Sequence, residues 1–150
     1  MDDSEPNSTP FDVGTMLHTG QSPANQHEVK EMESKPNWQT VSSLMFAATV
    51  SQPDIMFAVS MVSRFVHNLD LDHWHAVIKI MKYVQGTRDL TIRYKADSNG
   101  QVAYSDTGYA GDCNSRQSTK GYMSCGPVTW CSHWQKCVSN STMDAATKIV

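Results

Sequence analysis

The sequence predicts an α+β chain, in which a small helical region is followed by an antiparallel sheet and an incomplete C-terminal helix. Through most of residues 38–85, apolar side chains recur with the 3.6-residue period of a helix. Near Asp89 the period changes to two, as in a half-buried strand. The chain has 150 residues, 39% of them hydrophobic, which suits one ordinary domain or two small pieces and excludes a wholly disordered chain.

Residues 1–36 are expected to form an extended, loosely attached linker arm. They are mostly polar and contain four of the six prolines of the chain. Polar segments that contain proline and glycine are typical of loops. Only the stretch from Gln26 to Glu33 indicates a short helical turn.

Three amphipathic helices are predicted next, over residues 38–50, 53–68 and 72–85. Pro53 suits the first turn of the second helix, and Gly86 is expected to stop the third. Three consecutive helices with short connections can pack as a small bundle.

The remaining residues predict short strands and one helix. Alternation indicates strands over 90–94 and 101–105, joined by a turn at 97–100, and then over 119–124 and 128–131. A short helix is expected to start near Ser141, which is a suitable cap. This half of the chain therefore predicts an antiparallel sheet with an incomplete helix behind it.

Charge and composition limit the function classes. The net charge of −3 argues against a stand-alone nucleic-acid binder with a basic surface, but not against a fragment of a larger nucleic-acid enzyme. No apolar run approaches the roughly 18 residues of a membrane span, and the first residues do not resemble a signal peptide. We therefore expect an intracellular protein that is not secreted and has no membrane partner.

The cysteines do not have the spacing of a zinc site. None of the four forms a C-x-x-C pair, and a chain of this length does not need a disulfide framework. We expect four reduced thiols in or near the small sheet, at Cys113, Cys125, Cys131 and Cys137.

Beyond these patterns, successive stretches of the sequence resemble copia-type LTR retrotransposon Pol polyproteins. Residues 43–47, SLMFA, followed by residues 52–55, QPDI, are similar to the "GSLMYA…RPDIA" text of that family. The similarity continues in the same order through MKYVQGT at 81–87, STKGY at 118–122 and STM at 141–143.

The resemblance implies a position within Pol. Residues 1–36 would be a linker, residues 37–88 the helical end of the reverse transcriptase, and residues 89–150 a truncated ribonuclease-H-like domain. The metal-binding carboxylates of the polymerase would lie upstream of Met1. The corresponding region of a complete element would act on an RNA–DNA hybrid.

The resemblance also implies which residues belong to the nuclease site. Ribonuclease H cuts the RNA strand with two divalent cations held by carboxylates, Mg²⁺ in the complete family domain. Asp106 matches the first carboxylate, in "YSDADW". In "STxExE", Asp144 takes the first glutamate position and Ala146 the second, which aligns with the catalytic glutamate.

The match is thus incomplete. Asp106 would be a vestigial metal ligand and Asp144 a doubtful one, with further ligands expected beyond Val150. We expect no cofactor as the chain stands, and neither polymerase nor nuclease activity. From the residues alone, Asp106 beside Gly108 is better explained as a turn residue at a strand end.

Two non-catalytic alternatives remain, binding to nucleic acid and binding to protein. Four cations of the helical region could contact phosphates of a hybrid, namely Arg64, Lys79, Lys82 and Arg88. An ordinary solvated helix face explains the same charges. The open edge of an unfinished sheet favours self-association or docking onto a protein partner. In the loop after Asp106, Asp112 and Arg116 are expected to be solvated.

Overall fold

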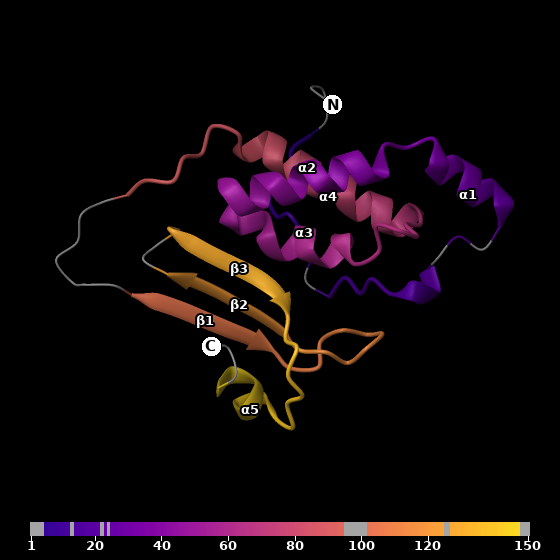
Figure 1. Cartoon of the computed structure of the whole chain (residues 1–150). Helices are drawn as coiled ribbons and strands as arrows, with labels where there is room; N and C mark the ends of the chain where they lie inside the picture. Colours follow the sequence, from indigo (N-terminus) through magenta and orange to yellow (C-terminus); the bar gives the residue numbers. More distant parts are fainter. Residues whose placement is uncertain are drawn as a thin grey trace. The chain divides into compact units, whose positions relative to one another are not determined.

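The computed structural model describes residues 5–12, 14–21, 23, 25–94, 102–124 and 127–147. The chain divides into two compact units, Met1–Leu90 (the first unit) and Thr91–Val150 (the second unit). The first unit is helical, and the second holds a three-stranded antiparallel sheet and a short helix (Figure 1). The fold is therefore α+β, as the sequence predicts. Within the described ranges, no helix has the length and apolarity needed to cross a bilayer.

The N-terminal segment contains more structure than the predicted turn. It forms a 3-10 turn, η1 (Thr19–Gln21), and an α-helix of eight residues, α1 (Gln26–Glu33). The Asn25 side chain accepts hydrogen bonds from the first free N–H groups of α1, which stabilises the helix start. Leu17 and Met32 are buried, so this segment contributes apolar side chains to the interior.

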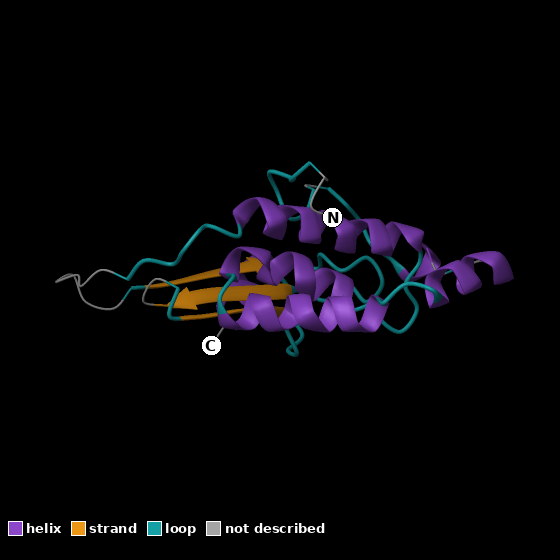
Figure 2. Cartoon of the chain, turned by 90° about the horizontal axis from the view of Figure 1, so that it is seen from above, coloured by secondary structure: helices purple, strands orange, loops and turns teal. Residues whose placement is uncertain are grey.

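The first unit is built on α2 (Asn37–Val50), η2 (Pro53–Ile55), α3 (Met56–Ser63) and α4 (Leu71–Thr87). The α2, α3 and α4 helices pack against one another (Figure 2). Their apolar faces supply most of the buried side chains, among them Val41, Leu44, Ala48, Ile55, Val59, Val62, Val77 and Ile80. The predicted helical bundle is present in this form.

The second predicted helix, over 53–68, is too long. Its first residues form the 3-10 turn η2, and α3 ends at Ser63. The hydroxyls of Ser60 and Ser63 donate to the carbonyls of Phe57 and Ser60, three residues back, and so compete with the regular ladder. The next bonds, such as Phe65 N–H to Val62 O, also span three residues and tighten the chain into turns.

The third helix continues past the predicted stop at Gly86. This glycine lies within α4, where a Cβ atom would be 2.7 Å from the Cβ of Pro6. Its role is therefore close approach of the N-terminal segment rather than helix termination. The Lys79 ammonium also pairs with the Asp12 carboxylate, which brings the same segment to α4.

The sheet consists of β1 (Ala103–Gly108), β2 (Thr119–Ser124) and β3 (Thr129–Trp134) in the order β1-β2-β3 (Figure 1). The β2 strand matches its predicted bounds, and the other two start and end later than predicted. The predicted strand at 90–94 is wrong, because these residues have no regular structure (Figure 2). Alternation alone does not make a strand, since a neighbouring strand must supply hydrogen bonds. The predicted turn at 97–100 lies outside the described residues.

A short helix, α5 (Thr142–Thr147), packs against β1 (Figure 1). Among the described residues of the second unit, the buried ones are Asp112, Ser118, Gln135 and Ala145. The Gln135 Nε2 amide donates to the Ala145 carbonyl over 3.1 Å. The interior of this unit is thus mostly polar and hydrogen-bonded.

Candidate functional site

Asp106, the match to the first nuclease carboxylate, lies in the second half of β1. Its Cα partner on β2 is Gly121, so no side chain faces it across the ladder on that strand. Asp106 is exposed, and its Oδ1 accepts the Thr107 backbone N–H over 2.8 Å. The carboxylate thus stands at the surface of the sheet and bonds to its own neighbour.

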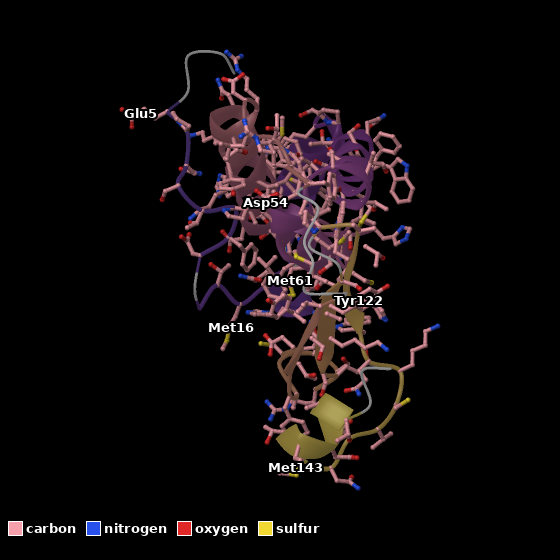
Figure 3. All side chains as sticks on the ribbon, turned by 90° about the vertical axis from the view of Figure 1, so that its left-hand side faces the viewer. Glu5, Met16, Asp54, Met61, Tyr122 and Met143 are labelled. Carbon is pink, nitrogen blue, oxygen red and sulfur yellow. The ribbon has the colours of Figure 1, made fainter. Side chains whose placement is uncertain are left out.

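Asp144, the second candidate, takes part in the start of α5. Its Oδ2 accepts the Asn140 N–H over 3.0 Å, and its own N–H donates to Ser141 Oγ over 3.1 Å. These two bonds close the first turn in the manner of a capping box. Met143, next to it, is exposed and extends outward from the helix (Figure 3).

The structure brings the two carboxylate-bearing elements together, because α5 packs against β1. It does not complete a metal site. In the part of the chain that the structure describes, no three His, Cys, Asp or Glu side chains are grouped to hold an ion. Ala146, at the position of the aligned catalytic glutamate, has no ligand atom. A pair of Mg²⁺ ions needs more oxygen ligands than Asp106 and Asp144 provide, so the residues present do not fit such a centre.

The four cations that the sequence offers for phosphate contact come from three places in the first unit. Lys79 and Lys82 lie three residues apart on α4 and are neighbours on its surface. Arg64 follows α3, and Arg88 follows α4. The Lys79 charge is matched by Asp12, and the Arg88 Nε lies 3.8 Å from the Asp89 Oδ2. Their role in nucleic-acid binding stays a prediction.

The cysteines in the described ranges, Cys113, Cys131 and Cys137, are free thiols, and Cys125 lies outside those ranges. Cys131 in β3 has its Sγ 2.7 Å from His133 Nδ1. Burial raises the pKa of the Cys131 thiol, and burial also lowers the pKa of His133, with smaller contributions from Lys120 and Lys136. A thiol with a raised pKa is a poor nucleophile near neutral pH, so this pair does not resemble a catalytic dyad.

The second unit contains a pocket that no sequence pattern predicted. A cavity of about 380 Å³ lies between the loop that follows β1 and the loop that follows β3. Its lining includes Lys136 and Arg116, and Arg116 is exposed as the sequence predicts. The same expectation is wrong for Asp112, which is buried because its carboxylate accepts hydrogen bonds from Ser115 within the loop. No sequence motif in either loop predicts that the two loops are neighbours. The pairing of the strands brings them together and so forms the pocket.

The chain is similar to known Pol sequences along most of its length. It is 36% identical over 148 residues to the Retrovirus-related Pol polyprotein from transposon TNT 1-94 of Nicotiana tabacum, with 97% of this chain and 11% of that protein covered. It is 35% identical over 114 residues to the Retrovirus-related Pol polyprotein from transposon RE2 of Arabidopsis thaliana, with 73% of this chain and 8% of that protein covered. The chain thus spans about a tenth of the length of these polyproteins.

A shorter relative is covered over most of its length. The Secreted RxLR effector protein 161 of Plasmopara viticola is 32% identical over 117 residues, which are 75% of this chain and 82% of that protein. No protein-family model and no solved structure matches the chain. With its similarity to these Pol polyproteins, the chain belongs to the family of retrovirus-related Pol polyproteins of copia-type transposons.

Proposed function

We propose that the chain is a segment of Pol that joins the helical end of the reverse transcriptase to the opening of the ribonuclease H domain, and that it does not cleave RNA as it stands. The order of elements supports this position. A helical unit is followed by an antiparallel sheet whose first strand carries Asp106, and then by a helix with the STxExE-like text. The proposed boundary near residue 88 lies close to the division between the two units.

One observation carries the proposal of inactivity, and it concerns α5. Ala146 stands where the family places its catalytic glutamate, and a methyl group binds no metal. The remaining carboxylate of the helix, Asp144, accepts the Asn140 N–H at the helix start. A carboxylate lost from a two-ion centre removes the charge that holds the ions close together.

Mn²⁺ binding and hybrid cleavage test this proposal on the whole 150-residue chain. We expect no saturable Mn²⁺ binding in calorimetry at submillimolar metal and no cleavage of an RNA–DNA hybrid above a no-protein control. Ala146→Glu should bring measurable Mn²⁺ binding, because it adds a carboxylate to the helix that packs on β1. In the Ala146→Glu background, Asp106→Asn should remove that gain.

Two results would contradict the proposal. Saturable Mn²⁺ binding together with hybrid cleavage by the unaltered chain would show that other residues complete the site. A gain in Ala146→Glu that Asp106→Asn leaves unchanged would show that β1 and α5 do not form one carboxylate site. Glu5→Gln is the matched control for Asp106→Asn, because it removes a carboxylate from the first unit, about 100 residues away in the sequence.

A second candidate function, a protein-interaction module, is favoured by the surface of α2. This helix exposes three large apolar side chains, Trp38, Phe46 and Val50, with Phe46 71% exposed. Exposed apolar side chains gathered on one element often mark an interface. The β1 and β3 strands are also the two edges of the described sheet.

The occupant we expect is a second copy of this chain. Light scattering after size exclusion should then give a mass that rises with protein concentration. Phe46→Ser should lower the self-association, whereas Met143→Ser, which removes an equally exposed side chain from α5, should not. A constant monomer mass over the concentration range would rule this candidate out.

A further inference from the structure

The lining of the pocket in the second unit includes two cationic side chains and several hydroxyls, besides amide and apolar side chains, and no carboxylate. The loop after β1 contributes Arg116 and Ser118, and the loop after β3 contributes Lys136 and Ser139. Neither Asp106 nor Asp144 is among the lining residues. We propose that this pocket is an anion site that takes a phosphate group, with Arg116 and Lys136 as its charged ligands.

The loop that carries Arg116 is fixed by a buried aspartate. The Asp112 Oδ2 accepts both the N–H and the hydroxyl of Ser115, each over 2.7 Å. The Asp112 N–H donates to Gln117 O, and the Arg116 N–H donates to Asp112 O over 2.9 Å. Asp112 is buried, and its carboxylate is directed to Ser115 within the loop. The loop is therefore ordered before any ligand arrives, which lowers the entropy lost on binding.

The backbone of this loop adopts conformations that residues with side chains rarely use. Arg116 has a φ of 58°, and Ala110, at the other end of the pocket loop, has a φ of 48°. Left-handed non-glycine residues persist only when their surroundings hold them, and they are common at ligand sites. Arg116 therefore combines a left-handed backbone conformation with one of the two positive charges of the pocket.

A buried hydroxyl adds a neutral donor to the two cations. Ser118 is 8% exposed and lines the pocket. Its Oγ accepts the Ala110 N–H over 3.2 Å, a bond that uses an oxygen lone pair and leaves the hydroxyl hydrogen to donate. A serine hydroxyl has one hydrogen to donate besides its acceptor lone pairs. A phosphate oxygen in the pocket would accept it.

The combination of donors matches the chemistry of a phosphate. A guanidinium can bind two oxygens of a phosphate at once, and a lysine ammonium adds a compact positive charge. The combined charge of the two cations, about +2, suits a phosphate dianion or the phosphodiester groups of a nucleic-acid backbone. The group can come from two sources, free phosphate in solution or the backbone of a nucleic acid.

Phosphate titration of the ¹⁵N-labelled 150-residue chain, followed by NMR, is the direct test. Inorganic phosphate should shift the amide signals of Arg116, Ser118 and Lys136 saturably, and chloride at the same ionic strength should not. Arg116→Gln and Lys136→Gln should each weaken binding about tenfold, as expected for one charge-assisted hydrogen bond. Arg93→Gln removes an exposed arginine of the same unit outside the pocket and should change nothing.

A second Arg116 variant separates binding from folding. Arg116→Gly suits the positive φ and should keep the signal dispersion and the unfolding midpoint of the parent, while phosphate binding falls as in Arg116→Gln. Equal loss in Arg93→Gln, shifts that never saturate, or the same shifts with chloride would each overturn the proposal.

An oligonucleotide distinguishes the two sources. A single-stranded DNA octamer without terminal phosphates should shift the same three amides if the pocket takes backbone phosphates. Shifts there with inorganic phosphate but not with the octamer would identify free phosphate as the ligand and keep the anion site. The nucleic-acid source is overturned if octamer binding survives Arg116→Gln but is lost in Lys79→Glu/Lys82→Glu, because the contact would then lie on α4.

Discussion

The Tyr83 hydroxyl donates a 2.6 Å hydrogen bond to the Oδ2 of Asp54 and so joins α4 to η2. The two residues lie 29 positions apart, and Asp54 stands in the turn η2 between α2 and α3. This bond to the carboxylate, with smaller contributions from burial and the Asp54 charge, raises the pKa of Tyr83 from its ordinary value near 10 to about 12.

The raised pKa predicts that the first unit loses stability in alkali. The neutral phenol is the form that donates the hydrogen bond, so the folded chain binds the Tyr83 proton more tightly than the unfolded chain does. The stabilisation is complete below pH 10 and is lost as the pH rises through about 12. Urea unfolding between pH 8 and pH 12 should show this loss, and Tyr83→Phe should remove most of it. Tyr104→Phe, at an exposed position on β1, is the control.

His73 predicts the opposite dependence, a loss of stability in acid. Its ring is fully buried against Phe65, with ring centroids 4.5 Å apart, and its Nδ1 accepts the Asp70 N–H. Its Nε2 atom is buried and has no hydrogen-bond partner within the described ranges. Burial lowers the pKa of His73 below its usual value near 6.5, and the charges of Asp70 and Asp72 oppose this only in part.

Because the unfolded chain binds the proton more readily, stability is complete above pH 6.5 and falls as the pH decreases below it. His73→Gln keeps an acceptor for the Asp70 N–H and should flatten the dependence between pH 7 and pH 5. His75→Gln, at an exposed position of the same helix, should not. An NMR titration of His73 that gave a pKa above 6.5 would contradict this reading.

The N-terminal segment is predicted to be held by burial more than by charge. Leu17 is 3% exposed, and Leu17→Ala should lower the free energy of unfolding by about 2–5 kcal/mol. Asp12→Asn breaks the ion pair with Lys79, but the Asp12 carboxylate is largely exposed, so the change should stay below about 1 kcal/mol. Thermal and urea unfolding of the two variants measure the difference. Equal losses would mean that the ion pair, and not Leu17, attaches the segment.

Thiol labelling should distinguish the described cysteines by exposure and by pKa. Cys113 and Cys137 are exposed, whereas Cys131 is partly covered and burial raises the pKa of its thiol. Since the thiolate is the reacting form, iodoacetamide at pH 8 should modify Cys131 last. Peptide mapping over time gives each rate separately, and the His133→Ala variant shows whether the neighbouring imidazole matters. If Cys131 reacted first, the predicted order of thiol reactivity would be wrong.

The sequence predicted those elements whose signal is local. The helices over 38–50 and 72–85 follow from the spacing of apolar residues, and β2 follows from alternation between two turn signals. The strand expected at 90–94 failed because pairing depends on a partner strand, which no property of those five residues supplies. Gly86 was read as a stop because glycine often ends helices, whereas its contact with Pro6 is set by tertiary packing 80 residues away.

The candidate site was predictable only through its resemblance to the family. Asp106 and Asp144 have no spacing of their own that indicates a metal, and family text alone singled them out. Arg116 is exposed, as expected, but its pocket partner, Lys136, lies beyond two strands, and no local pattern links the two residues. The antiparallel ladders that bring the two loops together are long-range contacts, and single-sequence patterns do not specify them.

The polar interior of the second unit has a thermodynamic consequence. Ala145 is the one buried hydrophobic residue among those described there, and the sheet is held largely by backbone ladders and side-chain hydrogen bonds. The heat capacity change and the denaturant dependence of unfolding both grow with the apolar surface exposed. Melting of this unit should therefore be broad and weakly dependent on urea, and calorimetry should separate it from the steeper transition of the helical unit.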